Sequence, residues 1–259
     1  MIYYSQFDED KIIFDLFSRK KIGCCVEVGA NNGIDDSTTF FFEKIGWKCI
    51  LVEPNPDLCD EIRKVRQGRL FECAVSNKKG QATLYIAEGA ERSHGVSTLS
   101  DKKEDQQRIR GYGFQCKPIK VKVKTLDDIL KQSEIDCEID FISIDVEGLE
   151  LEVLNGFSIE KWKPRIMMVE DNYNLENKSV KKYLKKHNYI TFNRTGVNDW
   201  YAHSSDKQFI NLKSKFRILC IYTDKKITKT IKTIKNTLKK IPILVKLHRL
   251  IVNKETSIN

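Results

Sequence analysis

The chain has 259 residues, of which 41% are hydrophobic and 10% aromatic. These values are typical of globular proteins and exclude a wholly disordered chain. The formal net charge is +9, but residues 225–259 alone hold ten basic residues and one acidic residue. The rest of the chain is therefore neutral, and its charge gives no support for nucleic-acid binding.

Three features predict a cytoplasmic protein without structural cross-links. No run of about 18 apolar residues is present, so no membrane span is expected. The start of the sequence, "MIYYSQFDED", is acidic where a signal peptide would be basic and then apolar. The eight cysteines form no C-x-x-C pair, which argues against a disulfide framework and against a structural zinc site.

Strands and helices alternate along most of the sequence. Strands are predicted at 24–28, 48–53, 69–75, 81–87, 117–124, 139–148 and 164–171. Helices are predicted at 36–46, 56–68, 125–132, 149–157 and 179–188. A closing hairpin is expected from 189–194 and 199–203. The pattern indicates an α/β fold, with helices on both faces of a mostly parallel sheet and an antiparallel edge.

The polar segment 88–116 lies between two of these strands and is too long for a simple connection. We expect it to be a loop or lid on the substrate side of the domain. Residues 1–224 then form one domain, and residues 225–259 form a basic tail.

The turn after the first strand, "CCVEVGANNG", raises the question of its ligand. A dinucleotide needs the spacing G-x-G-x-x-G, but only Gly29 and Gly33 are glycines here, and Asn31 takes the middle position. Glu27 would repel a phosphate by about 4 kcal/mol at 4 Å and a surface-like dielectric. The same charge would attract S-adenosylmethionine, which carries an ammonium and a sulfonium group.

The second and third strands extend this site. Glu53 ends the second strand, where an acid can accept hydrogen bonds from both ribose hydroxyls. Asn55 follows in the same loop. Ala74, between Cys73 and Ser76, is placed to flank an adenine ring.

Taken in order, several motifs resemble the FkbM family of class I S-adenosylmethionine-dependent methyltransferases. They run from about residue 4 to 203 and read "YSQFDED", "VEVGANNG", "LVEPNP", "AVSN", "HGVSTL", "TLDDIL", "IDVEGLELEVLNG" and "RIMMVED". The resemblance implies a Rossmann-like sheet of seven strands and methyl transfer, commonly to a hydroxyl oxygen. It also suggests that Gln6, in the first segment, contacts the methionyl end of the cofactor; a Ser5–Asp8 helix cap is the structural alternative.

Acidic residues end two neighbouring strands and supply candidate catalytic groups. Asp145 and Glu170 are the predicted general bases, and Asp145 is also expected at the cofactor. Glu147 reads as a helix cap. No metal is expected, although Asp145, Glu170 and Asp171 are the residues that would bind Mg²⁺ if one were present.

The segment 88–116 adds further candidates. His94 is a third candidate base. Three arginines are candidate binding residues for an anionic acceptor such as a sugar phosphate, namely Arg92, Arg108 and Arg110. The alternative for all four residues is a solvated lid.

The tail repeats isoleucine and leucine at helical spacing, with lysines between, from Ile227 to Ile241. Pro242 interrupts this pattern. A basic amphipathic helix can lie on an anionic membrane, here the inner face, or meet a partner. Packing against the domain or against a second subunit in a homodimer is the alternative.

These observations predict a methyltransferase that uses S-adenosylmethionine to methylate a sugar hydroxyl, in surface polysaccharide or nucleotide-sugar biosynthesis. N-methylation of an amine in a small molecule or glycan is one alternative. An NAD-dependent oxidoreductase and a non-catalytic scaffold that docks through its tail are the others.

Overall fold

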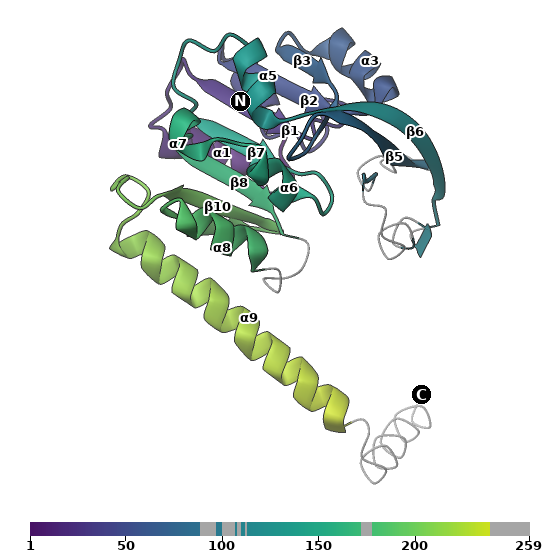
Figure 1. Cartoon of the computed structure of the whole chain (residues 1–259). Coiled ribbons are helices and arrows are strands. Elements are labelled where there is room, and N and C mark those ends of the chain that lie inside the picture. The colour runs from purple at the N-terminus through teal and green to yellow at the C-terminus, as the bar shows by residue number, and fades with distance from the viewer. Residues whose placement is uncertain (89–96, 100–106, 108–109, 112, 172–177, 239–259) are drawn as a thin grey trace, which may run out of the picture. The chain divides into compact units, whose positions relative to one another are not determined.

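The computed structural model describes residues 1–88, 97–99, 107, 110–111, 113–171 and 178–238. Seven strands form the main sheet, in the order β3-β2-β1-β7-β8-β10-β9 (Figure 1). Their bounds are β1 Cys24–Val28, β2 Lys48–Glu53, β3 Arg69–Glu72, β7 Phe141–Ile144, β8 Ile166–Glu170, β9 Tyr189–Thr195 and β10 Asn198–His203. From β3 to β8 in this order, each strand pairs in parallel with the next. The strand β10 pairs antiparallel with both β8 and β9. This confirms the predicted sheet and its antiparallel edge.

Helices cover both faces of the sheet because its central strands are apolar on both sides. Every residue of β1, β7 and β8 is buried. Alternate residues point to opposite faces of a strand; accordingly, Val26 and Val28 join one core cluster and Cys25 joins the other. Side chains of four helices complete the first cluster, namely α5 (Leu126–Gln132), α6 (Glu150–Asn155), α7 (Ile159–Trp162) and α8 (Ser179–Lys186). Side chains of three others complete the second, namely α1 (Glu9–Leu16), α2 (Phe40–Lys44) and α3 (Pro56–Val65).

All five predicted helices are present, with changed ends. The bounds are α1 Glu9–Leu16, α2 Phe40–Lys44, α3 Pro56–Val65, α5 Leu126–Gln132, α6 Glu150–Asn155, α7 Ile159–Trp162 and α8 Ser179–Lys186. Thr125 caps α5 as expected, by accepting a hydrogen bond from the N–H of Asp128. The Ser5–Asp8 cap is wrong, because the Ser5 hydroxyl donates to Asp10 instead, at 2.7 Å.

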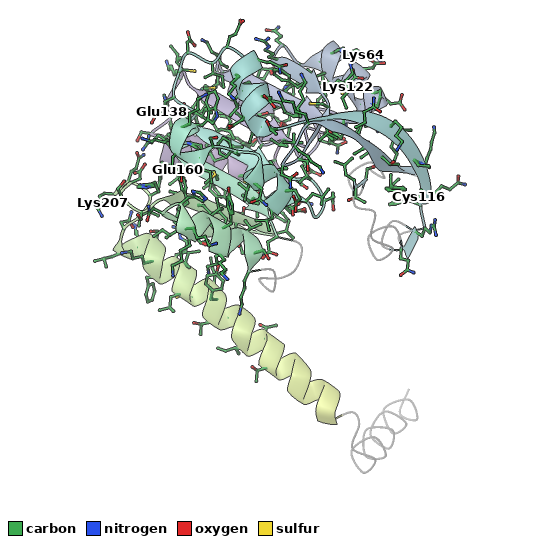
Figure 2. All side chains as sticks on the ribbon, viewed as in Figure 1. Lys64, Cys116, Lys122, Glu138, Glu160 and Lys207 are labelled. Atoms are coloured by element: carbon green, nitrogen blue, oxygen red, sulfur yellow. The ribbon has the colours of Figure 1, made fainter. Side chains whose placement is uncertain are left out.

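A second, three-stranded sheet has the order β4-β6-β5. Its strands are β4 Ala74–Val75, β5 Gly80–Glu88 and β6 Gln115–Lys124, and β5 and β6 pair antiparallel. The predicted third strand is therefore divided at Cys73, with β3 in the main sheet and β4 in this one. Figure 2 shows Cys116 and Lys122 at two places along β6. The inner face carries Leu84, Ile86 and Val121, which pack together in a small core of their own.

Residues 212–259 separate from residues 1–211 as a second compact unit. In its described part the chain forms one long helix, α9 Leu212–Leu238. The helix thus begins 15 residues before Ile227, where the sequence pattern of the tail starts. Over the residues that the structure describes, no helix is both long enough and apolar enough to cross a bilayer.

Candidate functional site

A cavity of about 740 Å³, open solvent included, lies at the carboxyl ends of β1, β2 and β7. In open parallel sheets this is the edge where ligands bind. The second sheet also contributes to the lining. The lining residues are Val28, Gly29, Asn31, Val52, Glu53, Pro54, Asn55, Leu58, Cys73, Ala74, Val75, Leu84, Ser97, Thr98, Leu99, Asp145, Val146 and Glu147.

Gly29 allows two strand ends to approach each other at the floor of the cavity. Its φ is +88°, and a Cβ at this position would lie 1.8 Å from the backbone oxygen of Asp145. The N–H of Asp145 in turn donates to the carbonyl of Val28, at 2.9 Å. Any side chain at position 29 would therefore push the first loop away from Asp145.

Glu53 is the buried acid of the cavity, with 6% of its surface exposed. Its two carboxylate oxygens accept hydrogen bonds from the N–H groups of Asn31, at 3.0 Å, and Asn55, at 2.9 Å. Burial raises the pKa of Glu53 to about 7, and the two hydrogen bonds partly oppose this rise. Each oxygen keeps acceptor capacity for a ligand hydroxyl.

Asn55 presents an unpaired donor to the cavity. Its Oδ1 accepts a hydrogen bond from the N–H of Asp57 and so caps α3, at 3.1 Å. Its Nδ2 is buried and has no hydrogen-bond partner within the described part of the chain. A buried amide without a partner is costly unless a ligand or water supplies an acceptor. Asn55 therefore has a donor that a ligand in the cavity or a water molecule could satisfy.

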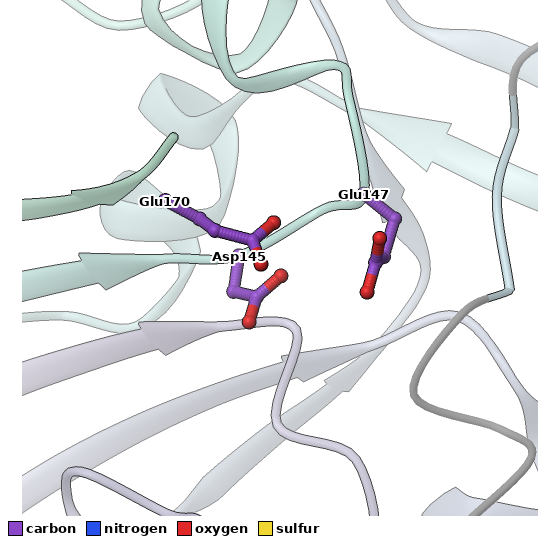
Figure 3. A group of neighbouring side chains, drawn as sticks. All are labelled: Asp145, Glu147 and Glu170. Atoms are coloured by element: carbon purple, nitrogen blue, oxygen red, sulfur yellow. The ribbon is translucent and has the colours of Figure 1, made fainter. Parts of the chain in front are cut away.

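Three carboxylates converge where β7 and β8 end (Figure 3). Oxygen atoms of Asp145, Glu147 and Glu170 all lie within 4.8 Å of one another. This group has the oxygen donors that a divalent cation prefers. It differs from the predicted metal set, because Asp171 is replaced by Glu147: the Asp171 carboxylate lies 3.4 Å from Nη1 of Arg194 instead.

The three acids differ in burial: Asp145 is exposed, Glu147 is half-buried and Glu170 is buried. Glu170 is buried, and burial raises its pKa well above the usual range, with further contributions from the charge of Asp145, the charge of Glu147 and a hydrogen bond with Asp145. Glu170 is thus protonated at neutral pH and donates to Asp145, which is exposed at the rim of the cavity. Asp145 is the more exposed member of this pair, and it lines the cavity, where a ligand can reach it.

Glu27, a predicted cofactor contact, lies outside the cavity lining and binds a neighbouring loop. Its carboxylate accepts hydrogen bonds from the hydroxyls of Ser37 and Thr39 and from the N–H of Thr38, at 2.6 to 3.2 Å. The buried Arg66 guanidinium lies 3.7 Å away. These contacts fix the loop after β1, and they hold residues 37–39 against Glu27, so that the predicted helix 36–46 begins only at Phe40.

Only some of the other predicted site residues line the cavity. Gly29, Asn31, Glu53, Asn55, Ala74 and Asp145 line the cavity as expected of cofactor-binding residues. Gly33 does not, since its carbonyl accepts a hydrogen bond from Arg66 instead. Gln6 and Arg110 are exposed and are also outside the lining. His94, Arg92 and Arg108 lie outside the described residues.

Sequence reasoning missed the wall that the second sheet supplies. Leu84 of β5 lines the cavity together with Thr98 and Leu99. Thr98 pairs with Tyr85 through two backbone hydrogen bonds, and its hydroxyl donates to the carbonyl of Glu147. The alternation of residues 81–87 predicted a half-buried strand, but nothing in it indicated that the buried face meets a ligand site.

The charged side chains that line the cavity, among the described residues, are all acidic. Within the described residues it contains three acids, Glu53, Asp145 and Glu147, and no lysine, arginine or histidine. Such a cavity disfavours a pyrophosphate and favours a ligand with positive charge. The lining therefore has the acidic character that the sequence predicts for the site; Glu53 and Asp145 are among the predicted cofactor contacts, whereas Glu27 is not in this lining.

The profile of a family described as the methyltransferase FkbM domain matches residues 27–191. No curated protein sequence gives a significant match. Two solved structures resemble the chain at 12% identity. One is a precorrin-6y C5,15-methyltransferase from Geobacter metallireducens, with a TM-score of 0.37 over 74% of this chain and 84% of that one. The other is the METTL16 methyltransferase domain, with a TM-score of 0.38 over 76% and 66%.

Proposed function

Because this chain belongs to the FkbM methyltransferase family, we propose that it transfers a methyl group from S-adenosylmethionine to a hydroxyl group of a sugar. The observation that carries the choice of donor is the lining of the cavity, which combines three acids with no basic side chain among the described residues. An NAD-dependent oxidoreductase is disfavoured by the same charge, since it must hold a pyrophosphate.

The residues of the cavity fit this donor. The carboxylate of Glu53 is placed to accept hydrogen bonds from the ribose hydroxyls, and Nδ2 of Asn55 offers the donor that lacks a protein partner. Leu58, Leu84 and Leu99 supply apolar surface for the base. When bound, S-adenosylmethionine supplies a methyl group activated by its sulfonium sulfur.

Asp145 is the proposed general base. A hydroxyl acceptor loses a proton during methylation, and a carboxylate at the rim of the cavity can take it, typically for a rate gain of about 10²–10⁴-fold. Glu170 holds Asp145 in position through their hydrogen bond. Alignment of the acceptor in the cavity supplies the rest of the rate gain that we expect.

A neutral sugar is the acceptor that we favour. The carboxylates of Asp145 and Glu147 would repel an anionic group close to the reacting atom. Oligosaccharides and nucleotide sugars in the synthesis of surface polysaccharide meet this condition when the charged part lies away from the cavity. We place this activity in the cytoplasm, where nucleotide sugars are made.

An amine acceptor is the second candidate. The cluster of Asp145, Glu147 and Glu170 would attract an ammonium group as well as accept its proton. N-methylation of an amino sugar therefore fits the same site.

Product analysis tests both proposals. The purified protein would be incubated with S-adenosylmethionine and a panel of neutral, amino and acidic sugars and nucleotide sugars, and formation of S-adenosylhomocysteine would be followed. We expect turnover with a neutral member, and an O-methyl group in its product by NMR. An N-methyl product would establish the second candidate. Turnover restricted to acidic sugars methylated next to their charge would contradict both.

A further inference from the structure

The helix α9 presents apolar side chains along one line of its surface. Leu212, Phe216, Leu219 and Ile227 are 86%, 68%, 62% and 52% exposed, which makes them four of the most exposed large hydrophobic side chains of the described chain. They are spaced by four, three and eight residues. In an α-helix with 3.6 residues per turn, these steps keep all four within a band narrower than half the circumference. We call this band the apolar stripe.

Basic residues occupy the other positions of the same helix. α9 contains eight lysine and arginine residues and one acidic residue, Asp224. Lys215 and Arg217 flank the stripe on either side, and Lys225 and Lys226 continue the positive charge further along. The helix is therefore strongly cationic as well as amphipathic. Because Ile231, Ile234 and Leu238 repeat the spacing in sequence, the pattern extends to the end of the helix.

From this combination we propose that α9 lies in the plane of an anionic membrane surface, with the apolar stripe inserted among the lipids and the lysines among their headgroups. Charge complementarity selects this occupant. A second copy of the chain would bring two such cationic helices together, with one acid on each to offset the basic residues. A spanning orientation does not fit, because α9 has no sufficiently apolar window.

Binding to vesicles tests the proposal with the full chain. The protein would be mixed with vesicles of neutral phosphatidylcholine, or of phosphatidylcholine with about 30% phosphatidylglycerol, and separated by flotation. We expect binding to the anionic vesicles at least tenfold tighter than to the neutral ones. Raising the salt concentration from 0.1 to 0.5 M should weaken it at least tenfold, because salt screens the headgroup charge.

Two variants locate the effect. Replacing three residues of the stripe (Phe216→Gln, Leu219→Gln and Ile227→Gln) should lower vesicle affinity at least tenfold. The matched control is Ile22→Gln, which removes an equally exposed apolar side chain from residues 1–211, at 77% exposure; its vesicle affinity should be unchanged. Since all four side chains are exposed, circular dichroism and the melting temperature should match the parent protein.

Three results would overturn the proposal. The first is a full chain that binds neither kind of vesicle, or both equally. The second is a triple variant that binds as the parent does. The third is a parent protein that binds no vesicles but forms a stable dimer by light scattering, which the triple substitution dissociates. That result would assign the apolar stripe to a second copy of the chain.

Discussion

The carboxylate of Glu27 and the guanidinium of Arg66 lie 3.7 Å apart, and both side chains are almost completely buried. Arg66 follows α3, and it also donates to the carbonyl of Gly33 and to Glu43, at 2.7 and 3.0 Å. The carboxylate of Glu27 also accepts hydrogen bonds from residues 37–39. The pair therefore connects the first strand, the loop after it and the end of α3, behind the cavity rather than inside it.

Replacing Arg66 by methionine should destabilise the fold strongly. The substitution leaves the buried carboxylates of Glu27 and Glu43 without their cation, which typically costs about 3–5 kcal/mol. Urea denaturation followed by circular dichroism measures the change. Arg63→Met is the matched control, because Arg63 pairs with Asp60 and Glu72 at the surface; exposed pairs contribute about 0–1 kcal/mol. Equal losses in the two variants would contradict this role of Arg66.

Gly29→Ala should abolish donor binding, whereas Gly46→Ala should not. Both glycines have a positive φ, +88° and +101°, so both variants carry a similar backbone strain, of about 1 kcal/mol. Only at position 29 does the new methyl group meet a backbone atom, the oxygen of Asp145, because nothing lies within 4 Å of a Cβ at position 46. Titration calorimetry with S-adenosylhomocysteine separates the two. Unchanged binding by Gly29→Ala would show that the loop tolerates the displacement.

Asp145→Asn should lower kcat by about 10²-fold or more, with the affinity for S-adenosylhomocysteine nearly unchanged, because the amide keeps the shape but cannot take a proton. Glu170→Gln should lower kcat much less, since its amide can still donate to Asp145 as the protonated acid does. Both are measured as initial rates on the identified acceptor. If Glu170→Gln were the more damaging change, the general base would be Glu170 instead.

The affinity for the donor should depend on pH through Glu53. Its pKa is raised to about 7 in the folded protein, so the carboxylate is ionised above this pH and protonated below it. Ribose hydroxyls donate to the ionised form, so affinity should rise with pH through 7 and fall about tenfold between pH 8 and pH 6. The stability of the free protein should move in the opposite direction, because the folded state binds the proton more tightly than the unfolded state between about pH 4.5 and 7. In Glu53→Gln both dependences should weaken.

Periodicity and turn residues in the sequence were sufficient to predict the parallel sheet. Short, continuous apolar runs such as 24–28 and 164–171 favour strands buried on both faces, and the helical patterns between them favour a parallel sheet. The division of the third strand at Cys73 could not be predicted, since β4 and β3 form one apolar run in sequence. What separates them is pairing, with β2 on one side and β6 on the other.

The position of a cavity residue could be predicted from the sequence where it follows from the end of a strand. Gly29, Glu53 and Asp145 end parallel strands, so the sheet itself brings them to one edge. The partners of Glu27 could not be predicted, because an acid at the end of a strand gives the same sequence pattern whether its carboxylate faces a ligand or a neighbouring loop. Its true partners, Ser37, Thr39 and Arg66, are ordinary surface residues in the sequence pattern. Only the tertiary structure shows that the first loop and the end of α3 close over them.

The most direct test of the central claim is calorimetric titration of the full chain and of Glu53→Ala with S-adenosylhomocysteine at pH 8, with NADH as a competing ligand. We expect one site per chain in the parent protein, no displacement by NADH, and at least tenfold weaker binding in the variant. The surface control Glu61→Ala should bind as the parent does, because this side chain is exposed and outside the cavity lining. Absence of binding in the parent, equal binding in Glu53→Ala, or displacement by NADH would contradict the assignment of this cavity to a cationic methyl donor.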